Sequence, residues 1–232
     1  FGPLVGTISG LGLWANFMLK SAFALIGFKA YLWVFEEILA PGRGEGWLYD
    51  NVNLAALVLL VIIVGINILG VKSIKKVQIP IVMFSSAYLL AICVWAVATS
   101  EMNWDAALSR EAFGSDWSAV ASTSAFVFVS YAGVTKIAAI GGEIKDPGRN
   151  LPYGILLSLL FSCVLYVTVT LVMAATVDPS GYMKNEGTEP REDPVYIFAK
   201  AVGGETVANI AAFLAVVTMT SMALAGILAS SR

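Results

Sequence analysis

Three lysines stand inside long apolar runs of this 232-residue chain, where an ammonium group must reach a partner or the membrane surface. Lys20 lies near the middle of the run 2–35, and a lysine at the centre of a bilayer-spanning helix costs about 2.5–3.5 kcal/mol. Its side chain must therefore face protein, ligand or water. Lys136 lies deep in another run, whereas Lys29 is close enough to the end of the first run to extend its ammonium group to the membrane surface.

The acidic residues offer these lysines no partner at the same depth. All sixteen Asp and Glu residues lie in predicted loops or at the ends of the apolar runs. We expect Lys20 or Lys136 to take the place of a coupling cation or to bind an anionic group. A buried lysine that loses its proton and carries protons is a further alternative. Glu143, seven residues after Lys136 on the same helix face, is an alternative partner for that lysine.

A second candidate binding feature is the stretch Ser130-Tyr131-Ala132-Gly133 inside an apolar run. Glycine weakens a helix by about 1 kcal/mol relative to alanine and adopts unusual backbone angles easily, so a break near Gly133 is predicted. Main-chain groups freed inside a membrane are tolerated only where they meet protein, a cavity, a ligand or an ion. The stretch therefore suggests a binding site, although glycine also serves close helix packing in membranes.

The composition requires that membrane-spanning helices position these residues. The chain is 58% hydrophobic and 13% charged, with a mean hydropathy of +0.81, which is typical of an integral membrane protein. A helix needs about 20 apolar residues to cross the hydrocarbon core. The sequence predicts an all-α fold, one transmembrane domain over residues 1–232. Its six predicted spans are 2–35, 52–71, 78–99, 117–143 (broken near 130–133), 152–177 and 206–230.

The distribution of charge predicts the orientation of these spans. The segments on one side carry six basic residues against two acids, and the segments on the other side carry five against fourteen. Because basic residues in short loops stay in the cytoplasm, we expect loops 72–77 and 144–151 to be cytoplasmic, in a multi-pass protein of the plasma or inner membrane.

The inventory of reactive side chains argues against several other functions. The chain has no histidine, and no Asp or Glu at depth could activate a nucleophile, so neither an enzyme nor a metal site is expected. Both cysteines lie in predicted spans, where packing explains them. We expect no cofactor beyond coupling Na⁺ or H⁺, and partners limited to lipid and a small-molecule solute, with no nucleic acid.

Several motifs together resemble the amino acid-polyamine-organocation (APC) superfamily of permeases. Tyr131-x-Gly133, followed by a cytoplasmic loop motif, is similar to the sixth helix of that family and the loop after it. The segments 2–32, 67–78 and 227–232 look like its third helix, its fourth-to-fifth helix loop and the end of its eighth helix. The chain thus resembles helices three to eight, and we expect it to be an internal segment of a longer protein. The loop motif consists of Glu143, Asp146, Pro147, Arg149 and Pro152.

The resemblance implies a LeuT-like fold of two inverted five-helix repeats and secondary active transport by alternating access. The solute would be an amino acid or a related small organic molecule, moved by proton or sodium coupling or by exchange. A nutrient sensor that binds without transport and a channel are the alternatives. The implied substrate site contains Ser130, Tyr131, Ala132, Gly133 and Thr135, and Val217, Thr220 and Ser221 resemble a sodium site. The two hydroxyl groups would instead bond back to their own helix if no cation binds there.

Overall fold

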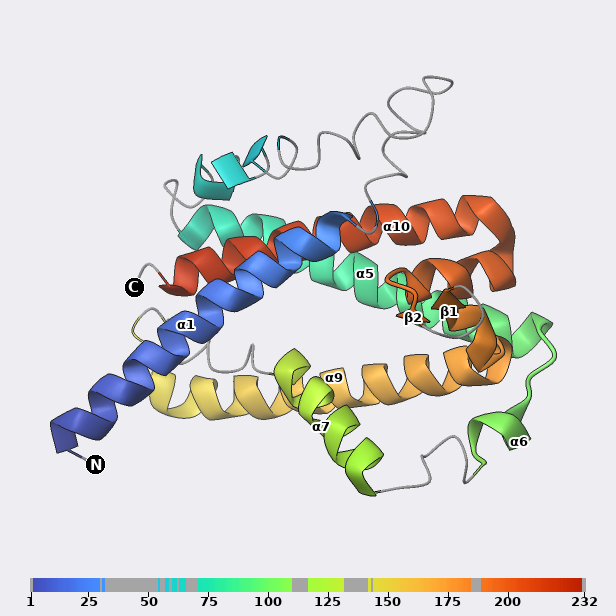
Figure 1. Ribbon diagram of the computed structural model, residues 1–232. Coiled ribbons are helices and arrows are strands. Elements are labelled where there is room, and N and C mark those ends of the chain that lie inside the picture. The colour runs from blue at the N-terminus through green and yellow to red at the C-terminus, as the bar shows by residue number, and fades with distance from the viewer. Residues whose placement is uncertain are drawn as a thin grey trace. The chain divides into compact units, whose positions relative to one another are not determined.

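The computed structural model describes residues 2–29, 31, 54, 57, 58, 60, 61, 63–65, 71–109, 117–131, 142, 144–184 and 189–230. The described chain is mainly helical, which confirms the predicted all-α class (Figure 1). Two short strands pair antiparallel, with Met183 opposite Pro190. The helices are α1 (Gly2–Lys29), α5 (Val71–Thr99), α6 (Trp104–Ala107), α7 (Trp117–Tyr131), α9 (Pro147–Thr176), the 3₁₀ helix η2 (Pro179–Tyr182) and α10 (Pro194–Ser230), and the strands are β1 (Met183–Lys184) and β2 (Glu189–Pro190).

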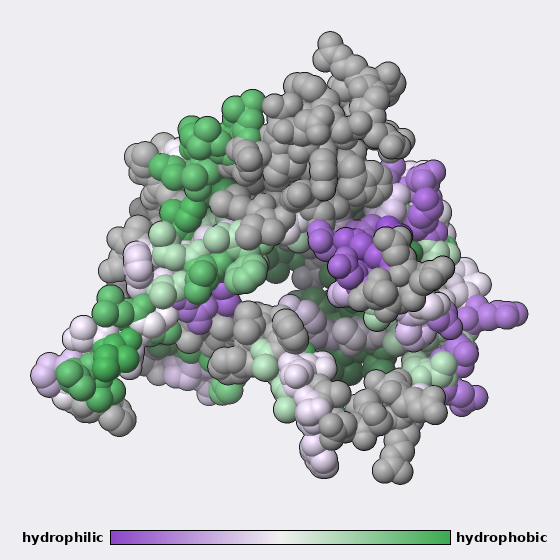
Figure 2. Space-filling view, in the orientation of Figure 1, coloured by the Kyte–Doolittle hydropathy of each residue, from purple (hydrophilic) through white to green (hydrophobic). Residues whose placement is uncertain are grey.

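Three stretches of helix within the described residues are long and apolar enough to cross a membrane. They are Gln78–Thr99 in α5, Pro147–Thr176 in α9 and Pro194–Ile227 in α10. Large apolar side chains such as Phe84 and Leu160 are exposed on these helices, as lipid-facing residues are. Figure 2 shows the same apolar character along much of α1. The chain is a multi-pass membrane protein.

Helices α5 and α9 include residues that the sequence analysis assigned to connecting loops. The basic segment 72–77 forms the start of α5, because no glycine or proline interrupts the chain between residues 71 and 79. Helix α9 begins at Pro147, where the fixed φ angle of proline suits the first helical position and its missing N–H group has no helical partner to lose. Both basic segments therefore continue into spanning helices.

Helix α10 begins at Pro194 and contains a kink. Gly204 interrupts the helical backbone with φ 74° and ψ −167°. Glycine adopts this conformation readily because it has no Cβ atom. The kink separates a short first segment from the long apolar segment of the predicted last span. Lys200, before the kink, forms an ion pair of 2.8 Å with Glu205, which follows it.

One compact unit consists of residues 1–88, 192–200 and 204–232. Small side chains form much of its interior, so helix backbones can approach closely. Ala24 of α1 and Ile63 form a buried cluster with Ala223 and Leu224 of α10. Gly27 of α1 lies against α10, where a Cβ atom added to it would be 3.1 Å from the Met219 methyl carbon. Helix α1 therefore packs on the second half of α10.

The other compact unit consists of residues 89–191 and 201–203. Helix α6 is capped by the Asn103 side chain, which accepts a hydrogen bond of 3.0 Å from the Ala106 N–H group. The Asn103 main-chain N–H donates to the Ala175 carbonyl at 2.8 Å, which fixes α6 against the end of α9. In the following connection, hydrogen bonds from Ser180 lower the pKa of Asp178, and burial raises the pKa of Tyr182 to about 12.

The packing at Gly27 generates a stability prediction. Gly27→Val should lower the thermal unfolding temperature of the full-length protein in detergent, because its Cβ atom would lie 3.1 Å from the Met219 methyl carbon and its two further methyl groups require the Met219 side chain to move. Gly12→Val is the matched control, since a Cβ atom there meets nothing within 4 Å. Equal unfolding temperatures for the two variants would contradict this packing.

Candidate functional site

Tyr131 is the residue of the predicted substrate stretch whose contacts the structure describes. It is the last residue of α7 and is half-buried. Its ring lies 5.5 Å from that of Tyr166 on α9, tilted by 51°, and the Cys163 thiol lies beside its hydroxyl group. Tilted aromatic pairs at this separation attract each other. Helix α9 therefore supports the end of α7 at the point where the sequence analysis places a binding site.

The other residues of the predicted substrate stretch have few described features. Ser130 is helical within α7, and nothing is described for its side chain. Ala132, Gly133, Thr135 and Lys136 lie outside the described residues. The predicted break of the helix near Gly133 remains a prediction.

Lys20 lies on the buried face of α1. The side chains of Phe17, Lys20, Ser21 and Ala24 recur at three- and four-residue spacing, and each is about 5% exposed or less. The Ser21 hydroxyl donates to the Phe17 carbonyl at 2.9 Å. The Lys20 side chain thus faces protein and not lipid. This position avoids the free-energy cost of placing its charge in hydrocarbon.

The three residues of the predicted cation site lie on one face of α10. Val217 and Thr220 are half-buried and Ser221 is buried. The Thr220 hydroxyl donates to the Val216 carbonyl at 2.9 Å, which is the hydrogen bond back to its own helix that the sequence analysis gave as the alternative. A donating hydroxyl still has oxygen lone pairs, so this bond leaves Thr220 able to accept a cation.

Two hydrogen bonds that the sequence analysis missed join α5 to α10 within one unit. The Gln78 side-chain amide donates to the Ser221 carbonyl at 3.1 Å. The Tyr88 hydroxyl donates to the Val207 carbonyl. Gln78 and Tyr88 could have been found from the sequence, because each is a polar side chain in an apolar run. A hydrogen-bond donor in hydrocarbon needs an acceptor, which another helix can supply. Gln78 thus attaches α5 directly to the predicted cation site.

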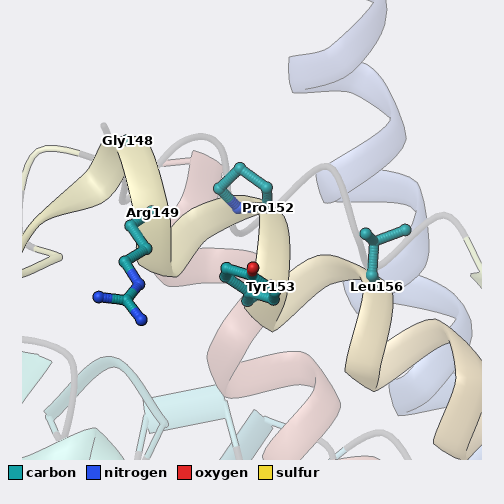
Figure 3. A pocket seen from close by; sticks show the side chains of 5 residues that line it. All are labelled: Gly148, Arg149, Pro152, Tyr153 and Leu156. Carbon is teal, nitrogen blue, oxygen red and sulfur yellow. The ribbon is translucent and has the colours of Figure 1, made fainter.

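The predicted cytoplasmic loop motif forms the start of α9. Asp146 precedes the helix in the left-handed conformation, and its carbonyl accepts hydrogen bonds from the N–H groups of Arg149 and Asn150 at 3.1 and 3.0 Å. Glu143 lies outside the described residues. Figure 3 shows the open surface pocket beside this helix start, with the Arg149 guanidinium extending away from the helix. The pocket, of about 440 Å³, is lined by Gly148, Arg149, Pro152, Tyr153 and Leu156.

Comparison with known proteins decides the family. A family model described as amino acid permease matches residues 1–232. The chain belongs to the amino acid permease family. The branched-chain amino acid permease BcaP of Bacillus subtilis (strain 168) is 29% identical to it over 242 residues, which cover 100% of the chain and 50% of BcaP. The methylthioribose transporter of the same organism is 28% identical over 246 residues, which cover 100% of the chain and 49% of that transporter.

A more distant permease relative comes from a plant. Cationic amino acid transporter 3, mitochondrial, of Arabidopsis thaliana is 31% identical over 131 residues, which cover 54% of this chain and 21% of that protein. The permease chain described here spans about half the length of its two bacterial relatives. The resemblance to APC permeases that the motifs indicated is therefore confirmed.

The backbone at Asp146 generates a prediction for the permease loop motif. Its φ of 49° suits glycine and disfavours a β-branched residue by about 1–2 kcal/mol. We expect Asp146→Gly to keep the thermal unfolding temperature of the full-length protein and Asp146→Val to lower it.

The matched control for that prediction is Lys145→Val, at an exposed neighbour whose φ is not positive. If the valine variants at residues 145 and 146 unfold at the same temperature, the left-handed conformation of Asp146 is wrong.

Proposed function

We propose that the chain belongs to a secondary active transporter that moves amino acids or related small organic solutes by alternating access. The observation that carries this proposal is the match of the amino acid permease family to residues 1–232. The names of BcaP and of the methylthioribose transporter are in keeping with a small polar solute. Uptake is driven by a proton gradient, a sodium gradient or exchange of one solute for another.

The solute site of this proposal lies at the end of α7. Main-chain carbonyls of Ser130, Tyr131, Ala132 and Gly133 accept hydrogen bonds from the solute amino group, with Thr135 close by. The ring contact between Tyr131 and Tyr166 supports the proposal, because it holds the end of α7 in a fixed position against α9. A site that binds a small solute needs such preorganised supports.

The coupling site of this proposal has two alternatives. Val217, Thr220 and Ser221 supply one carbonyl and two hydroxyl oxygens on one face of α10, a ligand set that suits sodium. Alternatively, Lys20 or Lys136 supplies a positive charge of its own, as a replacement for the coupling cation or as the partner of an anionic group. The burial of Lys20 supports this second alternative.

We further propose that the protein lies in the cell membrane with the segments 72–77 and 144–151 on the cytoplasmic side. The basic residues of these segments support this orientation. Arg149 and Tyr153 at the start of α9 are exposed, as residues at a membrane surface are.

Uptake into proteoliposomes tests the proposed transport. The full-length protein should take up at least one member of a radiolabelled amino-acid panel with saturation, under an imposed proton gradient or sodium gradient. Flux that does not saturate would indicate a channel. Ligand-induced thermal stabilisation without uptake would indicate a sensor.

Variants of the hydroxyl pair test the coupling site. If sodium drives uptake, Thr220→Val and Ser221→Ala should each raise the sodium concentration for half-maximal uptake about tenfold or more, because each removes one ligand oxygen. Thr218→Val is the matched control, since the Thr218 hydroxyl bonds to Ala215 on the same helix outside the proposed ligand set. A control variant as impaired as the other two would refute the assignment.

Lys136→Met tests the other coupling alternative. The variant should abolish coupled uptake or substrate binding in the same proteoliposome assay, because methionine has similar length but no charge. Unchanged, gradient-driven uptake by this variant would remove Lys136 from the mechanism.

A further inference from the structure

The open pocket at the start of α9 has a basic side chain at one end and an apolar side chain at the other. Arg149 extends its guanidinium group away from the helix, and Leu156 lies at the opposite end (Figure 3). Tyr153 lies between them, and both Tyr153 and Leu156 are more than half exposed. A pocket with this distribution of charge and apolar surface suits an amphiphilic anion.

The apolar end of the pocket continues as an exposed stripe along α9. Leu160, Val164 and Val167 follow Leu156 at spacings of three or four residues, so all four lie on one face of the helix. Each of them is more than half exposed. Because the helix segment Pro147–Thr176 is long and apolar enough to cross a membrane, this stripe can contact the acyl chains of lipids.

The length of the first part of this stripe matches one leaflet of a bilayer. Leu160 follows Arg149 by eleven residues, which is about 17 Å along a helix. Half of the hydrocarbon core is about 15 Å thick. With Leu160 near the middle of the membrane, Arg149 therefore lies at the level of the lipid headgroups. Tyr153, one turn from Arg149, then lies in the interface, where tyrosine is favoured.

A second basic residue lies next to the helix start. The Asn150 side-chain amide donates to the Lys145 carbonyl, which holds this part of the chain beside the first turn of α9. Lys145 and Arg149 are both exposed. Asp146 lies between them in the sequence, so the described segment 144–151 has two basic residues against one acid. The pocket therefore adjoins a surface of net positive charge.

The main chain at the helix start can also bind an anion. The Asp146 side chain forms no capping hydrogen bond with α9. The Gly148 N–H group, in the first turn, has no acceptor within the helix. A Cβ atom added to Gly148 would meet nothing within 4 Å, so a ligand can approach the main chain there. Phosphate groups bind well to N–H groups at such helix starts.

We propose that this pocket binds an anionic phospholipid of the leaflet next to the start of α9, which is the cytoplasmic leaflet in the proposed orientation. The lipid phosphate accepts hydrogen bonds from the Arg149 guanidinium and the Gly148 N–H group, and Lys145 adds positive charge. One acyl chain lies along the stripe from Tyr153 to Leu160. Zwitterionic lipids bind more weakly, because their ammonium group is repelled by the two basic side chains.

Native mass spectrometry of the full-length protein tests this site without any measurement of transport. Phosphatidylglycerol and phosphatidylcholine with the same acyl chains are titrated separately onto the detergent-solubilised protein, and the dissociation constant of the first bound lipid is measured. We expect phosphatidylglycerol to bind about fivefold or more tightly than phosphatidylcholine. Equal affinities would overturn the inference, because protein and not anionic lipid would then cover this face of α9.

A charge variant assigns the preference to the pocket. Arg149→Gln should weaken binding of phosphatidylglycerol about fivefold, which is the expected effect of removing one basic residue near an anionic lipid surface. Lys76→Gln is the matched control, because Lys76 is an exposed lysine on α5 that does not line the pocket. A control variant as impaired as Arg149→Gln would indicate general attraction to basic surfaces and overturn the site.

A steric variant tests the pocket while both basic side chains remain. Gly148→Leu should weaken binding of phosphatidylglycerol about fivefold or more, because the leucine side chain would occupy the pocket. Gly154→Leu is its matched control, since a Cβ atom there also meets nothing within 4 Å and Gly154 does not line the pocket. Unchanged affinity in Gly148→Leu, or equal losses in the two glycine variants, would overturn the site.

Competition with inorganic phosphate separates a lipid site from a site for a soluble anion. Binding of phosphatidylglycerol should persist in an excess of inorganic phosphate, because the apolar stripe contacts only the lipid. Displacement of the lipid by inorganic phosphate would indicate a soluble anion as the ligand and overturn the assignment to lipid. A protein that binds the lipid in this way but takes up no solute would refute the proposed transport and leave the lipid site standing.

Discussion

The hydrocarbon environment is the constraint on which the rest of this structure depends. Water is absent from the membrane interior, so each main-chain group must bond within the protein and each buried charge must find a compensating charge. Helices satisfy the main-chain groups, which explains the long helices α5, α9 and α10. The same constraint applies to each polar side chain within these helices. Placing a polar group in hydrocarbon costs free energy, which a contact or a ligand must offset.

Polar contacts in the described structure follow this rule in two ways. Gln78 and Tyr88 of α5 donate to main-chain carbonyls of α10, so their side chains link two helices that lie far apart in the sequence. Thr220 instead donates within its own helix. Among the described residues, Ser85 and Asn209 are the exceptions, since the Ser85 hydroxyl oxygen and the Asn209 amide oxygen are buried without a hydrogen-bond partner.

Small residues and special backbone angles set the geometry around these polar groups. Gly27 and Ala24 let α1 pack closely on α10, which places Lys20 against protein. Gly204 bends α10, and Asp146 in the left-handed conformation starts α9. Together these positions determine where the polar side chains lie, because helices are stiff and their directions are set at their ends and kinks.

The sequence by itself determined the class of the protein, the family and the places of unusual chemistry. Apolar runs predict membrane helices because their length must match the hydrocarbon thickness, and Lys20 is conspicuous because charge at that depth is costly. The start of α10 at Pro194 follows from local chemistry, because the fixed φ angle of proline suits the first position of a helix. Only the tertiary structure decided that Gln78 reaches Ser221 and that Tyr131 meets Tyr166. These contacts depend on how helices distant in sequence pack, which no local pattern of residues encodes.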